Sequence, residues 1–494
     1  MARKSTPTYT IELPLTIPIW QQHRLEKKCK IARNVYNSCL GEALKRHKRV
    51  KMDRKYRALL NEPTSKERNK QLSDIRLSYG FSEYGLHDFV RPIQHTFKEN
   101  IGSFEAQKLA TRAFQAVEKL HFGQAKKVHF KAFGDAISVE NKSNKTGLRY
   151  ADGHILWGDK PTKKNPKPQN WLCMPVVPKA HDQYAHLALL DETKYVRILK
   201  RDIRGKVRYF VQLIQEGYPP TKPERQVAND AAKRVGIDIG TSTIAISSEN
   251  TVALRELAPA CTLDETELRH IQRKMDRSKR ATNPDHFHEN GTVKQGRPIL
   301  NFSNRYKKLS QKRKERHRKV AVQRKMSHEI LANDLLALGS DIRVEMMRFQ
   351  SLQKRAKKTT YNPKNGKINR KKRFGKSIAN RALAMLLEII DRKLGYQQRS
   401  IKKIDTFATK ASQFNHLTSE YTKKQLSERW NDIGGHRIQR DVYSAFLIRN
   451  TTETLNSVDV DLCNAQWDNF VELHNHEMAR LKQSSSPTLR WFVA

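Results

Sequence analysis

The spacing of apolar residues divides the first part of the chain into a strand and a block of helices. Over residues 9–19 apolar and polar residues alternate and two prolines interrupt them, which predicts an edge strand or a pair of short strands. From about residue 22 the apolar residues instead recur at every third or fourth position, which predicts amphipathic helices. The predicted helices are residues 22–48, 86–101 and 104–120.

The pattern changes near residue 128, where short apolar segments are bounded by Gly, Pro or Asn. These segments are residues 136–139, 154–157, 185–190, 195–200 and 207–215. The last two flank the run Asp202-Ile203-Arg204-Gly205, which is typical of a hairpin turn. Several short strands at this spacing predict an antiparallel barrel or sandwich, to which residues 9–19 could add a strand. The helical block is then an insertion in a β domain, and the proline-rich residues 218–223 form a linker.

A strand that contains a single acid follows the linker. Residues 235–239 read Val-Gly-Ile-Asp-Ile, and β-branched residues around Asp238 suit a covered, pleated surface. Gly240 allows a backbone or a ligand to approach closely, and the next two residues open a turn to a second strand, residues 243–248. An unpaired buried carboxylate is costly, so Asp238 needs a partner. That partner is either a set of turn amides, which would make Asp238 structural, or a metal ion.

A long basic helix is predicted from residue 305 to Gly339. Between residues 305 and 326 Glu315 is the sole acid, whereas a helix made only for solubility would mix both signs of charge. We therefore favour a helix that follows a phosphate backbone. The expected nucleic-acid contacts are Arg305, Lys307, Lys312, Arg313, Arg316 and Lys319, then Arg33, Lys423 and Lys424. His286 and His288, in the loop before this helix, could bind a metal, but paired loop histidines without a third ligand more often face solvent.

Two further acids stand at the ends of predicted elements downstream. Residues 341–347 predict a short strand with Glu345 at its end. Residues 436–446, after a pair of glycines, have helical spacing, and Asp441 lies just off the apolar face near the first turn. Three carboxylates that converge in a cleft repel one another unless cations neutralise them, and two Mg²⁺ ions about 4 Å apart would do so. After these elements, a closing helix near residues 462–481 precedes residues 484–494, which look flexible.

Composition narrows the possible partners. The chain of 494 residues is long enough for about three domains. Its 95 Lys and Arg against 50 Asp and Glu give a net charge of +45, which indicates a polyanionic partner. An anionic membrane is the weaker alternative, because the chain has no apolar run of 18 residues and the basic stretches lack a broad apolar face. The amino-terminal residues do not resemble a secretory signal, and the scattered cysteines fit reduced, buried residues, so we expect a cytoplasmic protein.

The three acidic blocks, in this order and spacing, resemble the RuvC branch of the RNase H-like nucleases. They also resemble those of TnpB, the transposon-encoded RNA-guided nuclease, and of its descendants, the type V CRISPR effectors. Residues 32–37, Ala-Arg-Asn-Val-Tyr-Asn, are similar to the segment that opens the first recognition helix of TnpB. Phe374-Gly375-Lys376-Ser377, Ile404-Asp405-Thr406 and residues 409–413 are similar to segments that follow the second RuvC block. The likeness covers most of residues 9–450.

The resemblance implies a multidomain α/β fold, with an RNase H-like RuvC nuclease domain and a β-barrel wedge domain that carries an α-helical recognition insert. The implied wedge segments are 1–21 and 127–217, the insert is 22–126, the linker is 218–233, and the RuvC segments are 234–405 and 434–483. Between the RuvC segments, residues 406–433 correspond to a part that contacts the target strand. TnpB has Cys-x-x-Cys knuckles there and this chain has none, so we expect no zinc and a metal-free helical or loop element.

The resemblance further implies an RNA-guided DNA endonuclease, of a transposon or a CRISPR system, in the prokaryotic cytosol and associated with the nucleoid. Asp238, Glu345 and Asp441 would be the catalytic residues and would hold Mg²⁺ at a two-metal site. The partners would be a guide RNA and a double-stranded DNA target with a short adjacent motif, and no membrane. The alternatives are a guided DNA-binding repressor without cleavage, a transposase that uses the same acids, and a purely structural RNA-binding protein. The oligomeric state stays open.

Overall fold

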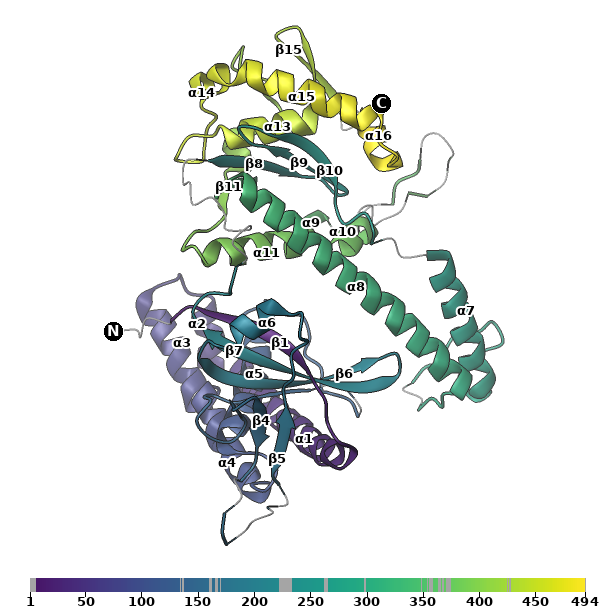
Figure 1. Cartoon of the computed structure of the whole chain (residues 1–494). Helices are drawn as coiled ribbons and strands as arrows, with labels where there is room; N and C mark the ends of the chain where they lie inside the picture. The colour runs from purple at the N-terminus through teal and green to yellow at the C-terminus, as the bar shows by residue number, and fades with distance from the viewer. Residues whose placement is uncertain are drawn as a thin grey trace. The chain divides into compact units, whose positions relative to one another are not determined.

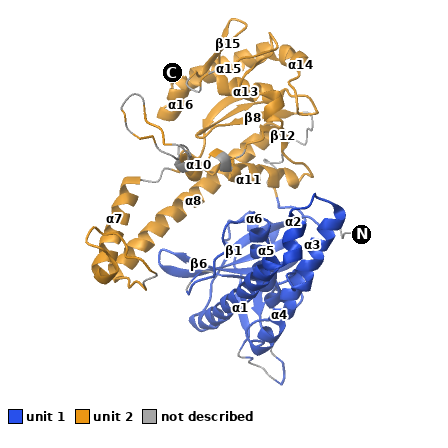
Figure 2. Ribbon diagram, turned by 180° about the vertical axis from the view of Figure 1, so that it is seen from behind, with its two compact units in different colours: residues 1–220 blue, residues 221–494 orange. Residues whose placement is uncertain are grey.

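A computed structural model gives the fold of the chain as two compact units, residues Met1–Pro220 and Thr221–Ala494 (Figure 2). It describes residues 6–493 apart from 134, 136, 160, 161, 165–167, 169, 222–232, 262–264, 297, 298, 348, 353, 355–358, 363–365, 367, 370–374, 424, 426 and 427. The boundary between the units lies within residues 218–233, the expected linker. No helix in the described part of the chain is long and apolar enough to cross a membrane.

The first unit contains the predicted helical block directly after its first strand, β1 (Thr8–Leu15). Its helices are α1 (Ile19–Met52), α2 (Arg54–Leu60), α3 (Lys66–Ser78), α4 (Glu83–Thr96) and α5 (Ser103–His121) (Figure 1). Helix α4 begins at Glu83 because Ser82 caps it, with its side chain accepting a hydrogen bond from the Gly85 amide. The apolar rows of α1 and α5 are buried, as their helical spacing predicted.

The described strands of the first unit form two antiparallel sheets. One has the order β1-β7-β6-β2, with β2 (Ser138–Glu140), β6 (Thr193–Ile203) and β7 (Lys206–Glu216); the other is β3 (Arg149–Ala151), β4 (His154–Trp157) and β5 (Leu172–Pro175). β1 is at a sheet edge and the β6–β7 hairpin turns at Arg204 and Gly205, both as predicted. Residues 185–190 were wrongly predicted as a strand: they lie mostly in helix α6 (Gln183–Ala188), which Asp182 caps. Closure into a barrel stays a prediction.

The second unit is built on a mixed five-stranded sheet in the order β10-β9-β8-β11-β12. β8 (Arg234–Ile239), β9 (Thr243–Ser247) and β10 (Val252–Glu256) are antiparallel, whereas β11 (Asp341–Glu345) and β12 (Lys402–Ile404) run parallel to β8. Antiparallel neighbours need only a tight turn, and parallel neighbours need a crossover. The crossover from β10 to β11 contains α7 (Glu265–Thr282), the short helix η2 (Pro284–His286) and α8 (Asn304–Leu338). The short helices α9 (Phe349–Leu352) and α10 (Gly375–Arg381), and then α11 (Leu383–Gly395), lie between β11 and β12.

Helices cover both faces of this sheet (Figure 1). On one face, apolar side chains of β8, β9 and β11 pack with α8 and α11 in one hydrophobic cluster. On the other face, a second cluster joins β9, β10 and β12 to α13 (Arg440–Arg449), α15 (Trp467–Lys482) and α16 (Pro487–Val493). Two short helices, α12 (Thr406–Thr409) and α14 (Val460–Ala465), complete the unit. A sheet covered on both sides has no solvated face, which explains the nearly continuous β-branched run around Asp238.

Two predictions for the carboxy-terminal part are wrong. Among the described residues of 406–433, α12 is followed by the hairpin β13 (Phe414–Asn415) with β14 (Glu420–Tyr421), and β15 (Trp430–Ile433) pairs with β16 (His436–Gln439). The helix with Asp441 therefore begins at Arg440, after a strand, and not at His436. Residues 484–494, predicted to be flexible, contain α16, because its apolar side chains Leu489, Phe492 and Val493 are buried in the second cluster.

This docking of α16 is testable with Phe492→Ala. Because Phe492 is buried in the cluster that α13 and α15 share, its loss should destabilise the second unit by about 3 kcal/mol. Hydrogen exchange of the α15 amides, measured in increasing urea, would report the change. Arg490→Ala, on the exposed side of the same helix, is the matched control and should have little effect. Equal exchange rates of the α15 amides in both variants would contradict the docking of α16 and support a flexible tail over residues 484–494.

Candidate functional site

Strand alternation places two of the predicted acids on the same face of the sheet. Val235, Ile237 and Ile239 of β8 pack with α8 and α11, so Gly236 and Asp238 face the opposite side, where α13 lies. In β11, Ile342 and Val344 pack with α8 and α11, and by the same alternation Glu345 points to the side of α13. The parallel register pairs Ile237 with Val344, so Asp238 and Glu345 follow at the carboxyl ends of adjacent strands.

The third acid reaches this edge because α13 packs very closely on β8. A Cβ atom added to Gly236 would lie 2.1 Å from the Ala445 carbonyl oxygen and 2.5 Å from the Arg449 nitrogen, both in α13. Only glycine fits such an approach of two backbones. Gly240, the glycine selected from the sequence for close approach, is less critical, because its added Cβ would lie 3.3 Å from Thr243 atoms. Asp441 stands in the first turn of α13, which Gln439 caps through the Val442 amide.

The charges of the three acids influence one another. Burial, then the neighbouring Glu345 and then Asp441 raise the pKa of Asp238 well above its usual value, while Arg440 acts in the opposite direction. Burial also raises the pKa of Glu345. Acids from β8, β11 and α13 therefore lie close enough for their charges to interact, and among the described residues no turn amide donates a hydrogen bond to the Asp238 carboxyl.

Two arginines, neither of them selected from the sequence, flank Asp441. Arg440 Nη2 lies 3.4 Å from Asp441 Oδ1 and Arg429 Nη1 lies 3.7 Å from Asp441 Oδ2. The guanidinium of Arg429 also stacks 4.7 Å from the ring of Trp491 and 4.6 Å from that of Phe492, both in α16. Arg440 was visible as the neighbour of Asp441 in the sequence, whereas Arg429 comes from the residues before β15 and carried no signal.

The donor set has the chemistry that a hard divalent cation prefers, since Asp238, Glu345 and Asp441 all offer carboxylate oxygens. The mutual repulsion that raises the pKa of Asp238 is what a cation would relieve. Within the described residues, however, no three His, Cys, Asp or Glu side chains lie close enough together to hold an ion. The residues fit the ion in chemistry and location, and binding by all three acids would require Asp441 to move away from its two arginines.

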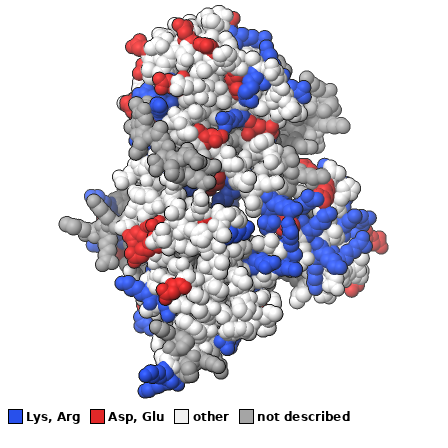
Figure 3. Space-filling view, viewed as in Figure 1, with Lys and Arg blue, Asp and Glu red and all other residues white. Residues whose placement is uncertain are grey.

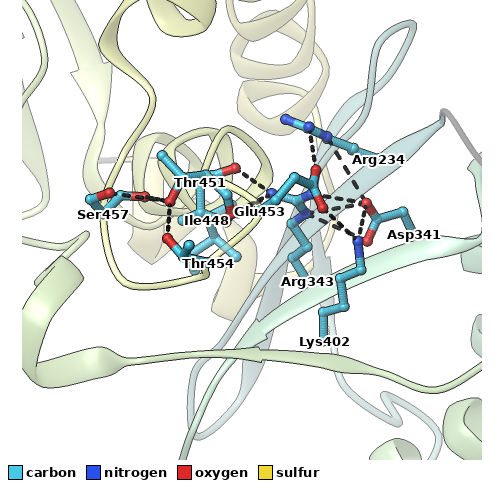
Figure 4. A network of polar contacts seen from close by, with 10 residues as sticks. Arg234, Asp341, Arg343, Lys402, Ile448, Thr451, Glu453, Thr454 and Ser457 are labelled. Carbon is cyan, nitrogen blue, oxygen red and sulfur yellow. Dashed lines mark hydrogen bonds and ion pairs between the residues drawn. The ribbon is translucent and has the colours of Figure 1, made fainter.

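A polar network fixes the opposite end of the same strands (Figure 4). The side chain of Arg343 is fully buried and pairs with Asp341 at 3.0 Å and with Glu453, in the loop after α13, at 2.8 Å. It also donates to the Thr451 carbonyl. Arg234 of β8 and Lys402 of β12 pair with the same Glu453 at 2.6 and 3.2 Å. Hydrogen bonds from Arg343 and Lys402 lower the pKa of Glu453 to about 2, so the network ties three parallel strands to the loop that follows α13.

The predicted nucleic-acid contacts differ in their surroundings. Arg305, Lys307, Lys319 and Lys423 are exposed, and Arg313 is half-buried. Lys312 and Arg316 are already paired with Glu267 of α7, at 3.0 and 2.7 Å, and hold the pKa of Glu267 below its usual value. Arg33 stacks 5.1 Å from the Phe133 ring, and Lys424 and Phe374 lie outside the described residues. The structure does not test whether any of these residues contacts nucleic acid.

Comparisons with known proteins give similarity to solved structures only. No family model and no curated protein matches the chain. A chain of a cryo-EM structure of a Cas12f1–sgRNA–target DNA complex is 11% identical, with a TM-score of 0.37 over 85% of this chain and 92% of that one. A chain of a CRISPR–Cas12f ternary complex is 13% identical, with a TM-score of 0.26 over 87% and 82% of the two chains.

The close approach at Gly236 yields a stability prediction. Gly236→Ala should destabilise the second unit by about 3 kcal/mol or more, because the added Cβ meets backbone atoms of α13 that cannot turn away. Urea-induced unfolding would measure it. Gly395→Ala, where an added Cβ meets nothing within 4 Å at the end of α11, is the control and should be neutral or slightly stabilising. Equal stability of the two variants would refute the tight contact.

The raised pKa of Asp238 predicts a stability that depends on pH. A carboxyl group whose pKa is higher in the folded state favours folding at low pH, and this contribution is lost as the pH rises from the ordinary value of 3.8 through the folded pKa. Asp238→Asn should therefore raise the melting temperature at pH 7.5 in a chelator, by about 2–5 °C, and raise it less near pH 4. The exposed Glu472→Gln is the control. A variant with a lower melting temperature than the wild type at pH 7.5 would contradict the repulsion.

Proposed function

We propose that the chain is an RNA-guided DNA endonuclease whose site is the edge formed by Asp238, Glu345 and Asp441. The observation that carries the proposal is the convergence of these acids from β8, β11 and α13, which leaves a cluster of negative charge at the carboxyl ends of two parallel strands. Open α/β sheets bind their ligands at this kind of edge. The TnpB-like segments of the sequence and the net charge of +45 support a guide RNA and a double-stranded DNA target as partners.

The proposed mechanism uses the carboxylates as the ligands of Mg²⁺. When bound, two such ions would activate a water and stabilise the leaving oxygen in phosphodiester hydrolysis. Asp238 and Glu345, on adjacent strands of a sheet covered on both faces, supply a rigid pair of ligands. Asp441 would complete the set after leaving Arg429 and Arg440, and these arginines would then be free to pair with phosphate oxygens. We propose no zinc ligand in residues 406–433.

A second candidate is a guided DNA-binding protein that does not cut. One observation favours it: the described residues contain no three acids close enough to share an ion, and Asp441 is paired with arginine instead. In that case the three acids would be a structural remnant, and binding of guide and target would be the whole activity. A transposase that uses the same acids has no observation in its favour beyond the acids themselves.

The experiment that separates these functions uses the protein purified with its co-expressed RNA. Wild type should cleave a guide-matched DNA duplex with Mg²⁺, and Asp238→Ala should lower the cleavage rate about 10³-fold or more while RNA binding is unchanged. Asp238→Asn tests the charge alone and should behave in the same way. Glu472→Gln, an exposed acid of α15, should cleave like the wild type.

Each other outcome identifies a different function. Cleavage that persists in Asp238→Ala, free of contaminating nuclease, would overturn the assigned site. Guide-dependent DNA binding by wild type without any cleavage would establish the non-cleaving candidate. Strand joining of supplied DNA ends in the absence of RNA would establish the transposase.

A further inference from the structure

The crossover from β10 to β11 contains a cavity outside the acidic edge. It has a volume of about 470 Å³ and lies between α7 and the start of α8. Its lining includes the cationic side chains of Lys274 and Arg277 from α7 and Arg305 from α8. Ser278, Thr282 and Ser303 also line it, so the cavity offers positive charge together with hydroxyl groups. Figure 3 shows that Lys and Arg side chains gather on the surface over these two helices.

The cations of the cavity differ from three cations further along α8 that are paired with acids. Lys312 and Arg316 share Glu267 as a partner, and Arg318 pairs with Glu315, at 2.7 to 3.0 Å. For Lys274, Arg277 and Arg305 the described residues provide no ion pair with an acid. Three exposed cations around one concave surface repel one another, and an anion between them would relieve that repulsion.

The start of α8 violates the usual charge rule for helices. The positive end of the helix dipole normally attracts acidic residues, but the first turn of α8 contains no acid and includes Arg305. Ser303 caps the helix by accepting a hydrogen bond from the Tyr306 amide. Arg305 is an unfavourable charge at the positive end of this 35-residue helix, and local violations of this type are typical of functional sites. A bound anion would compensate both the dipole and Arg305.

The walls of the cavity are held in place. The buried Asn283, directly after α7, donates to the Asn301 carbonyl at 2.8 Å and accepts from the Asn301 amide at 2.7 Å. This pair of bonds fixes the beginning of α8 beside the end of α7. The hydroxyls of Ser278 and Ser303 are 2.7 Å apart; one of their two hydrogens makes this bond, and the other can be donated to a ligand. The cavity is therefore pre-formed to a large extent.

Two aromatic residues, Phe302 and Tyr306, are close in the sequence to Ser303 and Arg305, which line the cavity. Phe302 directly precedes Ser303, is 41% exposed, and stacks on Tyr306 with ring centroids 4.4 Å apart. A nucleic-acid base can stack on such a face while its phosphate is held by neighbouring cations. A lipid surface would instead need a broad apolar face around the cations, and the cavity lining has only Ala281 as an apolar residue.

From these observations we propose that the cavity between α7 and α8 binds a phosphate of a single-stranded segment of RNA or DNA. Lys274, Arg277 and Arg305 hold the phosphate, and Phe302 stacks on a neighbouring base. The proposal rests on the proposed function for the identity of the strand in the cell. The binding itself needs neither the acidic edge nor a metal ion.

The test measures binding of a fluorescent ten-nucleotide oligothymidylate to the full chain without guide RNA, in a chelator, from 50 to 200 mM salt. The variant Lys274→Ala/Arg277→Ala/Arg305→Ala should bind about tenfold more weakly, with a salt slope reduced by about 0.7 for each phosphate that the protein no longer neutralises. The control Arg273→Ala/Lys314→Ala/Lys325→Ala removes the same charge from exposed positions of the same two helices and should change affinity less than about threefold. Phe302→Ala should weaken binding about fivefold or more without changing the slope.

The outcomes separate this site from the proposed nuclease. If the cavity variant and the control lose affinity equally, the site is overturned, whatever the result for Asp238. If the cavity variant instead loses binding to vesicles of anionic phospholipid and keeps the oligonucleotide, the site is overturned in favour of a membrane. If the cavity variant loses oligonucleotide binding as expected but Asp238→Ala still cleaves DNA, the phosphate site in the cavity is supported. Only the proposed nuclease site is then overturned. Thermal unfolding of each variant establishes that it is folded.

Discussion

The candidate site depends on one steric fact, the contact between the backbone of β8 at Gly236 and the last turn of α13. Because no side chain separates the two elements there, the helix lies directly on the strand, and its first turn brings Asp441 toward Asp238 and Glu345. The opposite face of the same strand is filled by Val235, Ile237 and Ile239, which pack against α8 and α11. One strand thus faces a hydrophobic core on one side and the candidate site on the other, because successive side chains of a strand point to opposite faces.

The two ends of the strands in the second unit's sheet differ in how their charged side chains are paired. At the amino ends, Arg234, Arg343 and Lys402 face Asp341 and Glu453, so charges of both signs are paired. At the carboxyl ends, acids lie near acids, and Asp441 is the one of the three acids that forms ion pairs with arginines in the described part of the chain. Paired charges at one end hold the strands and the loop after α13 in register, and this rigidity is what allows repelling acids to stay close at the other end. The stabilising and the chemical groups occupy opposite edges of one scaffold.

The sequence was informative where a pattern depends on local periodicity. The helical block, the β6–β7 hairpin, and the strands with Asp238 and Glu345 follow from spacing and turn residues. The errors come from tertiary context. Ile438 extends the helical spacing of the apolar residues that follow it, but residues 436–439 pair with β15 as a strand. Helix α16 looked flexible because its three buried residues are too few to show a period. Arg429 lies directly before β15 and contacts Asp441 in the folded chain, and no local sequence pattern predicts this contact.

The position of α13 near the end of the chain has a consequence for the newly made protein. Asp238 and Asp441 are separated by about 200 residues, which at ribosomal rates of roughly 5–20 residues per second take about 10–40 s to synthesise. During that time β8 and β11 can form with α8 and α11 on one face, but the other face still lacks its cover and the third acid. A chain interrupted between α8 and α13 carries the basic helix without the complete set of acids. Under the proposed function, such incomplete products would keep the predicted nucleic-acid contacts of the basic helix but would lack the assembled centre for cleavage.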